Sequence, residues 1–372
     1  MERDRVVGAW VRREVYARSG APRIDFAAAP DRSTIFAAKC EDRGRANPPN
    51  WACGAAAAPP FSRAMPSLDE RYQAIIKRLS ADVLLNEVFV FEKIEPIARE
   101  GHADAAMMMS LIRAIGYGCE RDWPAALEWA PIAAERGVEA ARAQLRFLAS
   151  ADDDDWRGLA ARVDVGAWTA AREGRVVYER PWISLSEGFL DARACAWMIA
   201  RAAPLQAQSL VYDPITGKAA QADVRTNTCA TFTILTLDLP TLLIRERIAN
   251  TVGVPVEHLE RVSVFRYTPG QQFASHVDYL TPSPQLNAEI AEIGQRPFTF
   301  LVYLNEAFEG GETHFLDIDK KFRGRTGDAL FWRNTDESGA PDLLTTHAGV
   351  APVSGEKWLL SQFIRDKAQL LG

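Results

Sequence analysis

The sequence predicts an α+β protein of more than one domain, in which an N-terminal α-helical repeat segment precedes a β-sandwich or jelly roll. Two observations support this fold class. Apolar residues recur at three- and four-residue spacing over residues 67–150, which is the period of amphipathic helices. After about residue 172, short β-branched and aromatic runs alternate with Gly and Pro, a pattern typical of strands joined by turns. A few helices followed by many short strands indicate a helical flank on a sheet domain.

Composition narrows the function classes. The 372 residues are 48% hydrophobic and 25% charged, which is typical of globular proteins and excludes a wholly disordered or fibrous chain. The net charge of -6 argues against a nucleic acid partner, and no apolar run is long enough to span a membrane. The five cysteines are scattered without a C-x-x-C pair, so we expect neither a disulfide framework nor a cysteine zinc site. This cysteine usage predicts a cytoplasmic protein.

Three regions follow from local composition. Residues 1–64 are rich in Pro and Ala clusters and carry about +4, so we expect a poorly ordered extension and a remainder near -10 that favours a basic or neutral partner. Residues 65–155 form the predicted helical repeat region, and residues 172–368 form the sheet domain. Translation from Met65 is a further hypothesis, because Ser67 and Glu70 form a capping box at the first convincing helix.

A short repeat lies inside the helical region. The segment 101–106 (GHADAA) recurs as 137–142 (GVEAAR), 36 residues later, which predicts stacked helical hairpins. The Ala-Ala-x-x-Gly pattern at 133–137 resembles the Sel-type relatives of tetratricopeptide repeats. Because two repeats are too few to bury a hydrophobic core alone, we expect this region to pack on the next domain. A structural cap and a groove for a protein partner both remain open. The acidic run 152–155 is interpreted as a linker in which Asp155 caps the next helix.

The second half supplies the individual strands and helices. We predict helices over residues 186–202, 239–252 and 288–293. Strands are predicted over residues 231–235, 261–267, 298–304, 329–332 and 358–364.

Three residues have the pattern of a metal site. In a strand, His276 and Asp278 share a face while Val277 points to the packing side. His347 on an adjacent strand would supply a third ligand. Two histidines and one carboxylate leave coordination positions open, which is the arrangement of non-heme Fe(II) oxygenases, whereas zinc more often has a closed set of four ligands. We expect His314 to be an ordinary histidine.

Several motifs accompany these residues in order. They are 266–273 (RYTPGQQF), 299–305 (TFLVYLN), 310–313 (GGET), 327–332 (GDALFW), 347–353 (HAGVAPV) and 355–358 (GEKW). With this ordered set, residues 175–367 resemble the Fe(II)- and 2-oxoglutarate-dependent dioxygenases, most closely the prolyl 4-hydroxylase-like branch.

The resemblance implies a double-stranded β-helix, a jelly-roll variant, as the catalytic domain. It implies that His276, Asp278 and His347 bind the iron and act in catalysis. Lys357, ten residues after His347, would bind the distal carboxylate of 2-oxoglutarate, and Tyr267 and Thr299 would line the cosubstrate pocket. Fe(II) is the implied cofactor and 2-oxoglutarate the cosubstrate, with ascorbate as a candidate further cofactor. In strand 357–364, alternation places Lys357 inside the barrel and Trp358 behind it.

Two departures from the family bear on the substrate. Phe273 and Phe363 stand where many relatives have Tyr and Trp, which weakens the inference that the substrate is peptidyl proline. The leading function is hydroxylation of a protein or peptide side chain, prolyl above all, with succinate as coproduct. The alternatives are hydroxylation of a free amino acid or other small molecule, and a catalytically silent repeat scaffold. Residues 279–297 are interpreted either as a substrate lid or as a surface excursion, and Arg296 either steers an acidic substrate or pairs with a carboxylate.

Overall fold

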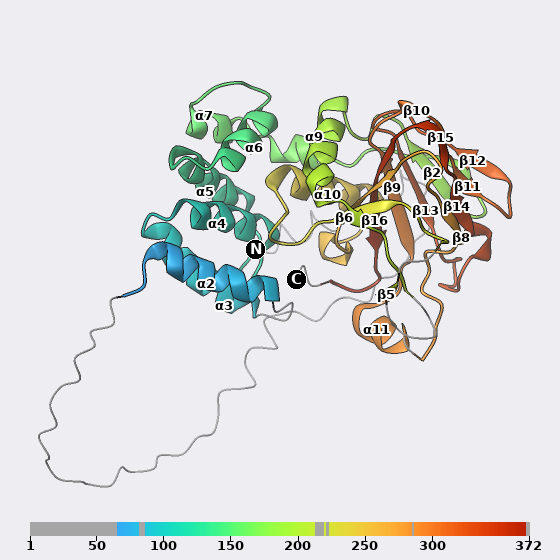
Figure 1. The fold of residues 1–372 in the computed structure, drawn as a ribbon, viewed down its shortest axis with the longest axis horizontal. Helices are drawn as coiled ribbons and strands as arrows, with labels where there is room; N and C mark the ends of the chain where they lie inside the picture. The colour runs from blue at the N-terminus through green and yellow to red at the C-terminus, as the bar shows by residue number, and fades with distance from the viewer. Residues whose placement is uncertain (1–64, 82–85, 213–218, 221–222, 285, 370–372) are drawn as a thin grey trace, which may run out of the picture.

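A helical region packs beside a body of antiparallel sheets, as the sequence predicts (Figure 1). The computed structural model describes residues 65–81, 86–212, 219–220, 223–284 and 286–369. The predicted extension 1–64 lies outside the described residues. The helices before the first strand are α2 (Leu68–Ala81), α3 (Glu87–Arg99), α4 (Ala103–Ile115), α5 (Trp123–Glu135), α6 (Glu139–Ala149), α7 (Trp156–Ala161) and α8 (Val165–Thr169).

Local capping explains where these helices begin. The Ser67 amide donates to Glu70 Oε2 at 2.8 Å and the Glu70 amide donates to Ser67 Oγ at 3.2 Å, so the predicted capping box is present at α2. The Asp155 carboxylate accepts from the Gly158 amide and caps α7, also as predicted.

The predicted repeat appears as two hairpins, α3–α4 and α5–α6. Gly101 and Gly137 occupy the same place in the two turns, and both have the positive φ that glycine adopts at little cost. The amide after each glycine donates to the carbonyl five residues before it, from His102 to Ile97 and from Val138 to Ala133. The 36-residue period therefore corresponds to a repeated helical hairpin.

The helical region is not an independent body. Helix α10 (Leu239–Val252) is buried on nearly all sides between this region and the sheets. Its Leu239 amide donates to Gln144 Oε1 at 2.9 Å, and Trp123 Nε1 donates to Glu246 Oε1 at 2.7 Å. One continuous apolar core runs through both parts, so the expectation that the helices pack on the next domain is confirmed.

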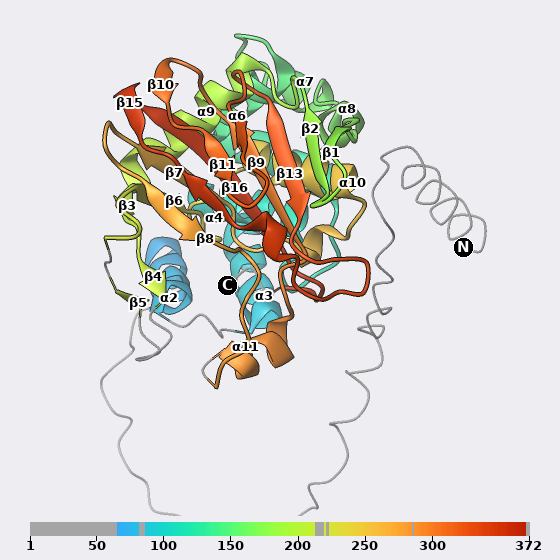
Figure 2. The same ribbon diagram turned by 90° about the vertical axis from the view of Figure 1, so that its right-hand side faces the viewer.

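The sheet domain consists of two main antiparallel sheets. The larger one has the strand order β1-β2-β13-β9-β16-β7-β6-β3, and the smaller one has the order β12-β11-β14-β8. Figure 2 shows the strands of the larger sheet side by side. Two short pairs, β10-β15 and β4-β5, complete the strands. The bounds are β1 (Arg175–Tyr178), β2 (Ile183–Ser186), β3 (Ala207–Gln208), β4 (Val211–Tyr212), β5 (Ala219–Ala220), β6 (Thr228–Thr231), β7 (Ser263–Tyr267), β8 (Phe273–His276), β9 (Phe298–Tyr303), β10 (Phe308–Gly310), β11 (Thr313–Phe315), β12 (Lys320–Phe322), β13 (Ala329–Arg333), β14 (His347–Gly349), β15 (Pro352–Gly355) and β16 (Lys357–Ile364).

Two predicted elements are displaced. The strand expected over 231–235 is wrong: β6 ends at Thr231, and Phe232 and Ile234 are buried in the turn that follows. Their apolar alternation reflects burial and not strand pairing. The helix expected from residue 186 is α9 (Ala192–Ala202), which begins only after Asp191 because that carboxylate caps it. Helix α11 (Leu286–Ile293) lies within the segment 279–297, close to its predicted position.

Among the described residues, none of the helices combines the length and the apolar character needed to cross a bilayer.

Candidate active site

A narrow pocket opens on the inner face of the larger sheet. Residues directly opposite in antiparallel strands point to the same face. Lys357 is opposite Tyr267, and Thr299 is opposite both Phe363 and Trp332. All five side chains line the pocket. Trp358, by contrast, packs in the core behind the sheet, so the alternation predicted for 357–364 is confirmed.

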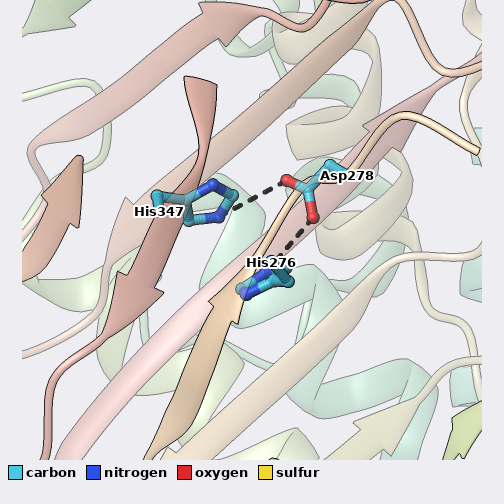
Figure 3. Close-up of side chains that lie close together, drawn as sticks. All are labelled: His276, Asp278 and His347. Atoms are coloured by element: carbon cyan, nitrogen blue, oxygen red, sulfur yellow. Dashed lines mark ion pairs between the residues drawn. The ribbon is translucent and has the colours of Figure 1, made fainter. Parts of the chain in front are cut away.

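The smaller sheet brings the three predicted metal ligands to this pocket. His276 on β8 is directly opposite His347 on β14. Asp278 Oδ1 lies 3.5 Å from His276 Nε2, and Oδ2 lies 3.7 Å from His347 Nε2, as Figure 3 shows. One ligand atom from each residue lies within 4.8 Å of the others.

One detail of the prediction is wrong, because His276 and Asp278 do not share a strand. Strand β8 ends at His276, the last residue paired with β14. The chain bends after Val277, and this bend turns the Asp278 carboxylate toward the two imidazoles.

Both imidazoles are oriented through their other nitrogen. His276 Nδ1 lies 2.8 Å from the Ala274 carbonyl, and His347 Nδ1 lies 2.9 Å from the Thr345 carbonyl. Since a carbonyl oxygen can only accept, each Nδ1 carries the hydrogen and each Nε2 turns a lone pair toward the centre. Burial lowers the pKa of His347 to about 4, which keeps this imidazole neutral, as a metal ligand must be.

The carboxylate of Asp278 is held in its ionised form. Burial by itself raises its pKa, but the polar imidazoles of His347 and His276 and the hydrogen bond from Thr299 together hold the pKa below its usual range. Thr299 Oγ1 donates to Asp278 Oδ2 at 2.8 Å. Asn334 Nδ2 in turn donates to Thr299 Oγ1 at 3.0 Å. Three buried side chains thus form a relay that fixes the carboxylate.

Sequence reasoning missed Asn334 and the packing around the ligands. Phe273 stacks on His276 with ring centroids 3.5 Å apart, and Trp332 meets His347 edge to face at 4.8 Å. Trp332 ends the quoted 327–332 motif and Asn334 follows it by two residues. The alternation of β13 could therefore have placed both side chains on the inner face.

The donor set fits Fe(II). Two neutral imidazole nitrogens and one carboxylate, all from one side, leave positions open for further ligands, the arrangement typical of non-heme Fe(II) oxygenases. His314 lies outside this cluster and its Nε2 lies 2.9 Å from Asp319 Oδ1, as expected for an ordinary histidine.

Lys357 lies deeper in the same pocket. Its side chain is 1% exposed, and among the described residues no group forms a hydrogen bond or ion pair with its ammonium. Burial lowers the pKa of Lys357 to about 7. Glu312 is the only carboxylate that opposes this lowering, and it forms no ion pair with Lys357 among the described residues, so the buried ammonium is a site for a carboxylate, which fits the distal carboxylate of 2-oxoglutarate. Tyr267 lines the same end, with the Lys357 ammonium 5.2 Å from its ring centroid.

The predicted site residues therefore converge, but Thr299 is engaged with Asp278. The Thr299 hydroxyl donates its hydrogen to the Asp278 carboxylate, so in this structure Thr299 contacts a candidate iron ligand. The roles of all six residues in binding iron and cosubstrate stay predictions that this geometry supports.

Two other expectations concern Arg296 and the segment 279–297, which lie outside the narrow pocket. Arg296 pairs with a carboxylate, that of Glu260, at 2.6 Å. The segment 279–297 is tied to the C-terminal end of the chain, since Glu289 on α11 pairs with Arg365 at 2.7 Å and the Gln295 amide donates to Asp366 Oδ1 at 2.9 Å. This segment does not line the narrow pocket in the described conformation.

Comparison with known proteins agrees with this arrangement. A family model described as the 2OG-Fe(II) oxygenase superfamily matches residues 262–365, a span that contains all six predicted site residues. Prolyl 4-hydroxylase 1 of Arabidopsis thaliana is 34% identical over 207 residues, which cover 52% of this chain and 72% of that protein. A putative prolyl 4-hydroxylase of Acanthamoeba polyphaga mimivirus is 36% identical over 124 residues, 33% of this chain and 51% of that protein. The viral collagen prolyl hydroxylase of Paramecium bursaria Chlorella virus-1 has 25% identity and a TM-score of 0.38, covering 51% of this chain and 98% of that structure.

The family uses Fe(II) as cofactor and 2-oxoglutarate as cosubstrate, the two groups that the donor set and the buried lysine fit. With that identity to the Arabidopsis enzyme over most of its length, the chain belongs to the prolyl 4-hydroxylase family of 2-oxoglutarate- and Fe(II)-dependent oxygenases.

Proposed function

We propose that this protein hydroxylates prolyl residues in a peptide or protein. His276, Asp278 and His347 would hold Fe(II), and Lys357 would hold the distal carboxylate of 2-oxoglutarate. Bound iron supplies the coupling of 2-oxoglutarate decarboxylation, which yields succinate and carbon dioxide, to hydroxylation of the substrate. The chain itself orients the ligands through backbone carbonyls and the Asn334–Thr299 relay and keeps the pocket walls apolar.

One observation favours a peptide over a free amino acid. The pocket at the ligands is narrow, about 30 Å³, but it borders a groove of about 740 Å³ that shares Phe265 and Phe363 as walls. Iron and 2-oxoglutarate would fill the narrow pocket, and the groove beside it suits the chain on either side of a target residue. The family relationship points to proline as that residue, although Phe273 and Phe363 replace the Tyr and Trp of many relatives.

The test is hydroxylation of defined substrates by the purified full-length chain with Fe(II), 2-oxoglutarate and ascorbate. We expect succinate release and a mass gain of one oxygen on a proline-containing peptide, located on proline by fragmentation. An Asp278→Ala variant is the control for background oxidation. Hydroxylation of free proline but of no peptide would contradict the proposal and favour a small-molecule enzyme. Absence of succinate with every substrate would favour a silent scaffold. Omission of ascorbate tests whether this reductant supports turnover.

We further propose that residues 65–155 are a Sel-type repeat region and that residues 172–368 are the dioxygenase domain. The contacts of Gln144 and Trp123 with α10 favour a structural role for the repeats over a partner groove. Limited proteolysis would test these limits, and the repeat fragment should be unstable alone because its core is shared. We also propose a cytoplasmic location, in keeping with free thiols at Cys119, Cys195 and Cys229, which cell fractionation would test.

A further inference from the structure

The groove beside the catalytic pocket differs in charge from the protein as a whole. It runs along the inner-face residues of β6, β7 and β16, three strands that lie side by side in the larger sheet (Figure 2). Four guanidinium groups and one carboxylate line it: Arg225, Arg261, Arg296, Arg365 and Glu260. The formal charge of these five residues is +3, in a chain of net charge -6. The overall charge therefore does not describe the surface that meets a substrate.

Two of these arginines are already neutralised. Arg296 donates to both oxygens of Glu260, at 2.6 and 2.9 Å. Arg365 also bonds Glu260 and pairs with Glu289 at 2.7 Å. Burial raises the pKa of Glu260, but the two guanidinium groups outweigh it and hold the pKa below its usual value, so the carboxylate stays charged. These pairs are internal structure, and they make the groove wall rigid.

The other two arginines have no carboxylate partner among the described residues. Arg261 is half-buried and forms no hydrogen bond there, and it lies on the same alternation as Ser263 and Phe265, which also line the groove. Arg225 uses its Nε for Asn227 Oδ1 at 3.2 Å, which leaves its two terminal nitrogens for another acceptor. Guanidinium groups bind carboxylates with two parallel hydrogen bonds and are less strongly hydrated than ammonium groups, so both arginines suit acidic side chains.

Arg225 also lies close to the reacting centre. Its guanidinium is 4.4 Å from the Phe273 ring centroid, and Phe273 stacks on His276 at 3.5 Å. The Arg225 guanidinium therefore lies at most about 8 Å from the His276 ring, a distance that an extended chain covers in about two to three residues.

We propose that Arg225 and Arg261 select substrates with acidic residues near the target, one of them two to three positions from the hydroxylated residue. This inference rests on the proposed function for the identity of the target residue. It reverses the expectation, drawn from the net charge alone, of a basic or neutral partner.

Binding of three labelled peptides tests the proposal without turnover. Each peptide contains one proline, and the positions two and three residues on both sides are all Glu, all Gln or all Lys. Fluorescence anisotropy is measured on the full-length protein with Mn(II) and 2-oxoglutarate under nitrogen. We expect the Glu peptide to bind about tenfold more tightly than the Gln peptide at low salt, and the Lys peptide to bind most weakly. The advantage of the Glu peptide should shrink at 0.5 M NaCl because salt screens partly exposed pairs.

Arg261→Glu is the decisive variant, because Arg261 forms no hydrogen bond among the described residues and its loss should leave the fold intact. It should abolish the advantage of the Glu peptide over the Lys peptide, because the new carboxylate offsets Arg225, and change KM with little change in kcat. Arg175→Glu is the matched control, since it makes the same charge change on β1 at the far edge of the sheet. Arg261→Gln should weaken the preference without abolishing it, because Arg225 remains.

The possible outcomes separate this inference from the proposed function. Equal affinity for the Glu and Gln peptides, no binding of any peptide, or an equal effect of Arg175→Glu would overturn the acidic preference. Hydroxyproline formation without a charge preference would overturn this inference alone. A charge preference in binding without any hydroxylation would leave it standing and overturn the proposed function.

Discussion

Two buried cations in this molecule have opposite surroundings. Arg247 on α10 is 7% exposed, and its three side-chain nitrogens donate to the carbonyls of Trp168, Phe189 and Ala167 at 2.7, 3.0 and 3.0 Å. Lys357 in the catalytic pocket is 1% exposed and has no hydrogen-bond or ion-pair partner among the described residues. Burial lowers the pKa of Arg247 to about 10, so it stays charged, and lowers that of Lys357 to about 7.

The difference separates a structural cation from a binding one. The backbone carbonyls around Arg247 satisfy its donors within the folded chain, so this residue joins α10 to its neighbours. Lys357 would be an unfavourable choice for a core, because a buried charge without a partner destabilises the folded state. Such a residue makes sense when a ligand supplies the anion. The same reasoning applies to the Nε2 atoms of His276 and His347, which face Asp278 across a space suited to a metal ion.

The largest effect should come from removing a ligand atom. Asp278→Ala leaves two neutral imidazoles and no anionic ligand, so we expect Fe(II) binding and 2-oxoglutarate turnover to fall below detection. Metal content after dialysis and succinate release measure the two effects.

His314→Ala is the control for Asp278→Ala. His314 is on β11 and pairs with the exposed Asp319, so its loss should cost less than about 1 kcal/mol and leave iron content unchanged. Equal loss of iron in the two variants would contradict the assignment of the site.

The comparison of the two cations predicts opposite effects of their removal. Lys357→Ala should weaken 2-oxoglutarate binding by about 3–5 kcal/mol, roughly 10²- to 4 × 10³-fold in Kd, without lowering the free energy of unfolding of the ligand-free protein. Arg247→Met should leave the Kd unchanged and lower the free energy of unfolding by about 3 kcal/mol, because three buried carbonyls lose their donors. Calorimetric titration and chemical denaturation measure the two quantities. If both variants only lost stability, Lys357 would be a structural residue like Arg247.

A smaller effect is expected from the relay behind the carboxylate. Thr299→Val removes the hydroxyl that donates to Asp278 and leaves the shape of the side chain nearly unchanged. We expect a 10- to 100-fold loss in metal affinity, the usual size for a residue that orients a ligand.

Two variants check that this effect runs through the hydroxyl. Thr299→Ser keeps the donor and should retain most of the affinity, while Asn334→Ala should give a weaker form of the Thr299→Val effect. If Thr299→Val changed the Kd for 2-oxoglutarate and not that for the metal, Thr299 would be a cosubstrate contact, as the family resemblance implies.

The sequence was most informative where function depends on local spacing. The capping residues Ser67 and Asp155, and the alternation that turns Lys357 to the inner face of its strand, all act within one element or turn. Their geometry follows from the periods of helices and strands, which is why these expectations agree with the structure. The strand predicted over residues 231–235 is wrong because local spacing alone cannot separate a buried turn from a strand, and both can have the same apolar pattern.

Long-range pairing was out of reach from one sequence. Nothing in the neighbourhood of Asn334 indicates that its amide bonds Thr299, because β13 and β9 become neighbours only through the sheet order. The pairing of Glu260 with Arg296 and Arg365 joins three separate segments. Since the sequence does not reveal these ion pairs, it does not show which arginines in the groove are unpaired. The net charge of the chain therefore predicted the wrong sign for the charge of this groove.

The smallest effect should be the pH dependence of cosubstrate affinity. It distinguishes Lys357, with a pKa of about 7, from Arg247, with a pKa of about 10. The pKa of Lys357 is about 7 in the ligand-free pocket, and a bound carboxylate raises it by favouring the ammonium form. A group whose pKa rises on binding gives its full contribution below the free value and loses it as pH increases above that value. We therefore expect the Kd for 2-oxoglutarate to be level below pH 7 and to rise up to about tenfold per pH unit above it.

Titrations at pH 6.5, 7.5 and 8.5 measure this slope. Lys357→Arg should flatten it, because a guanidinium stays charged throughout, whereas a slope that persists in this variant would assign the titration to another group.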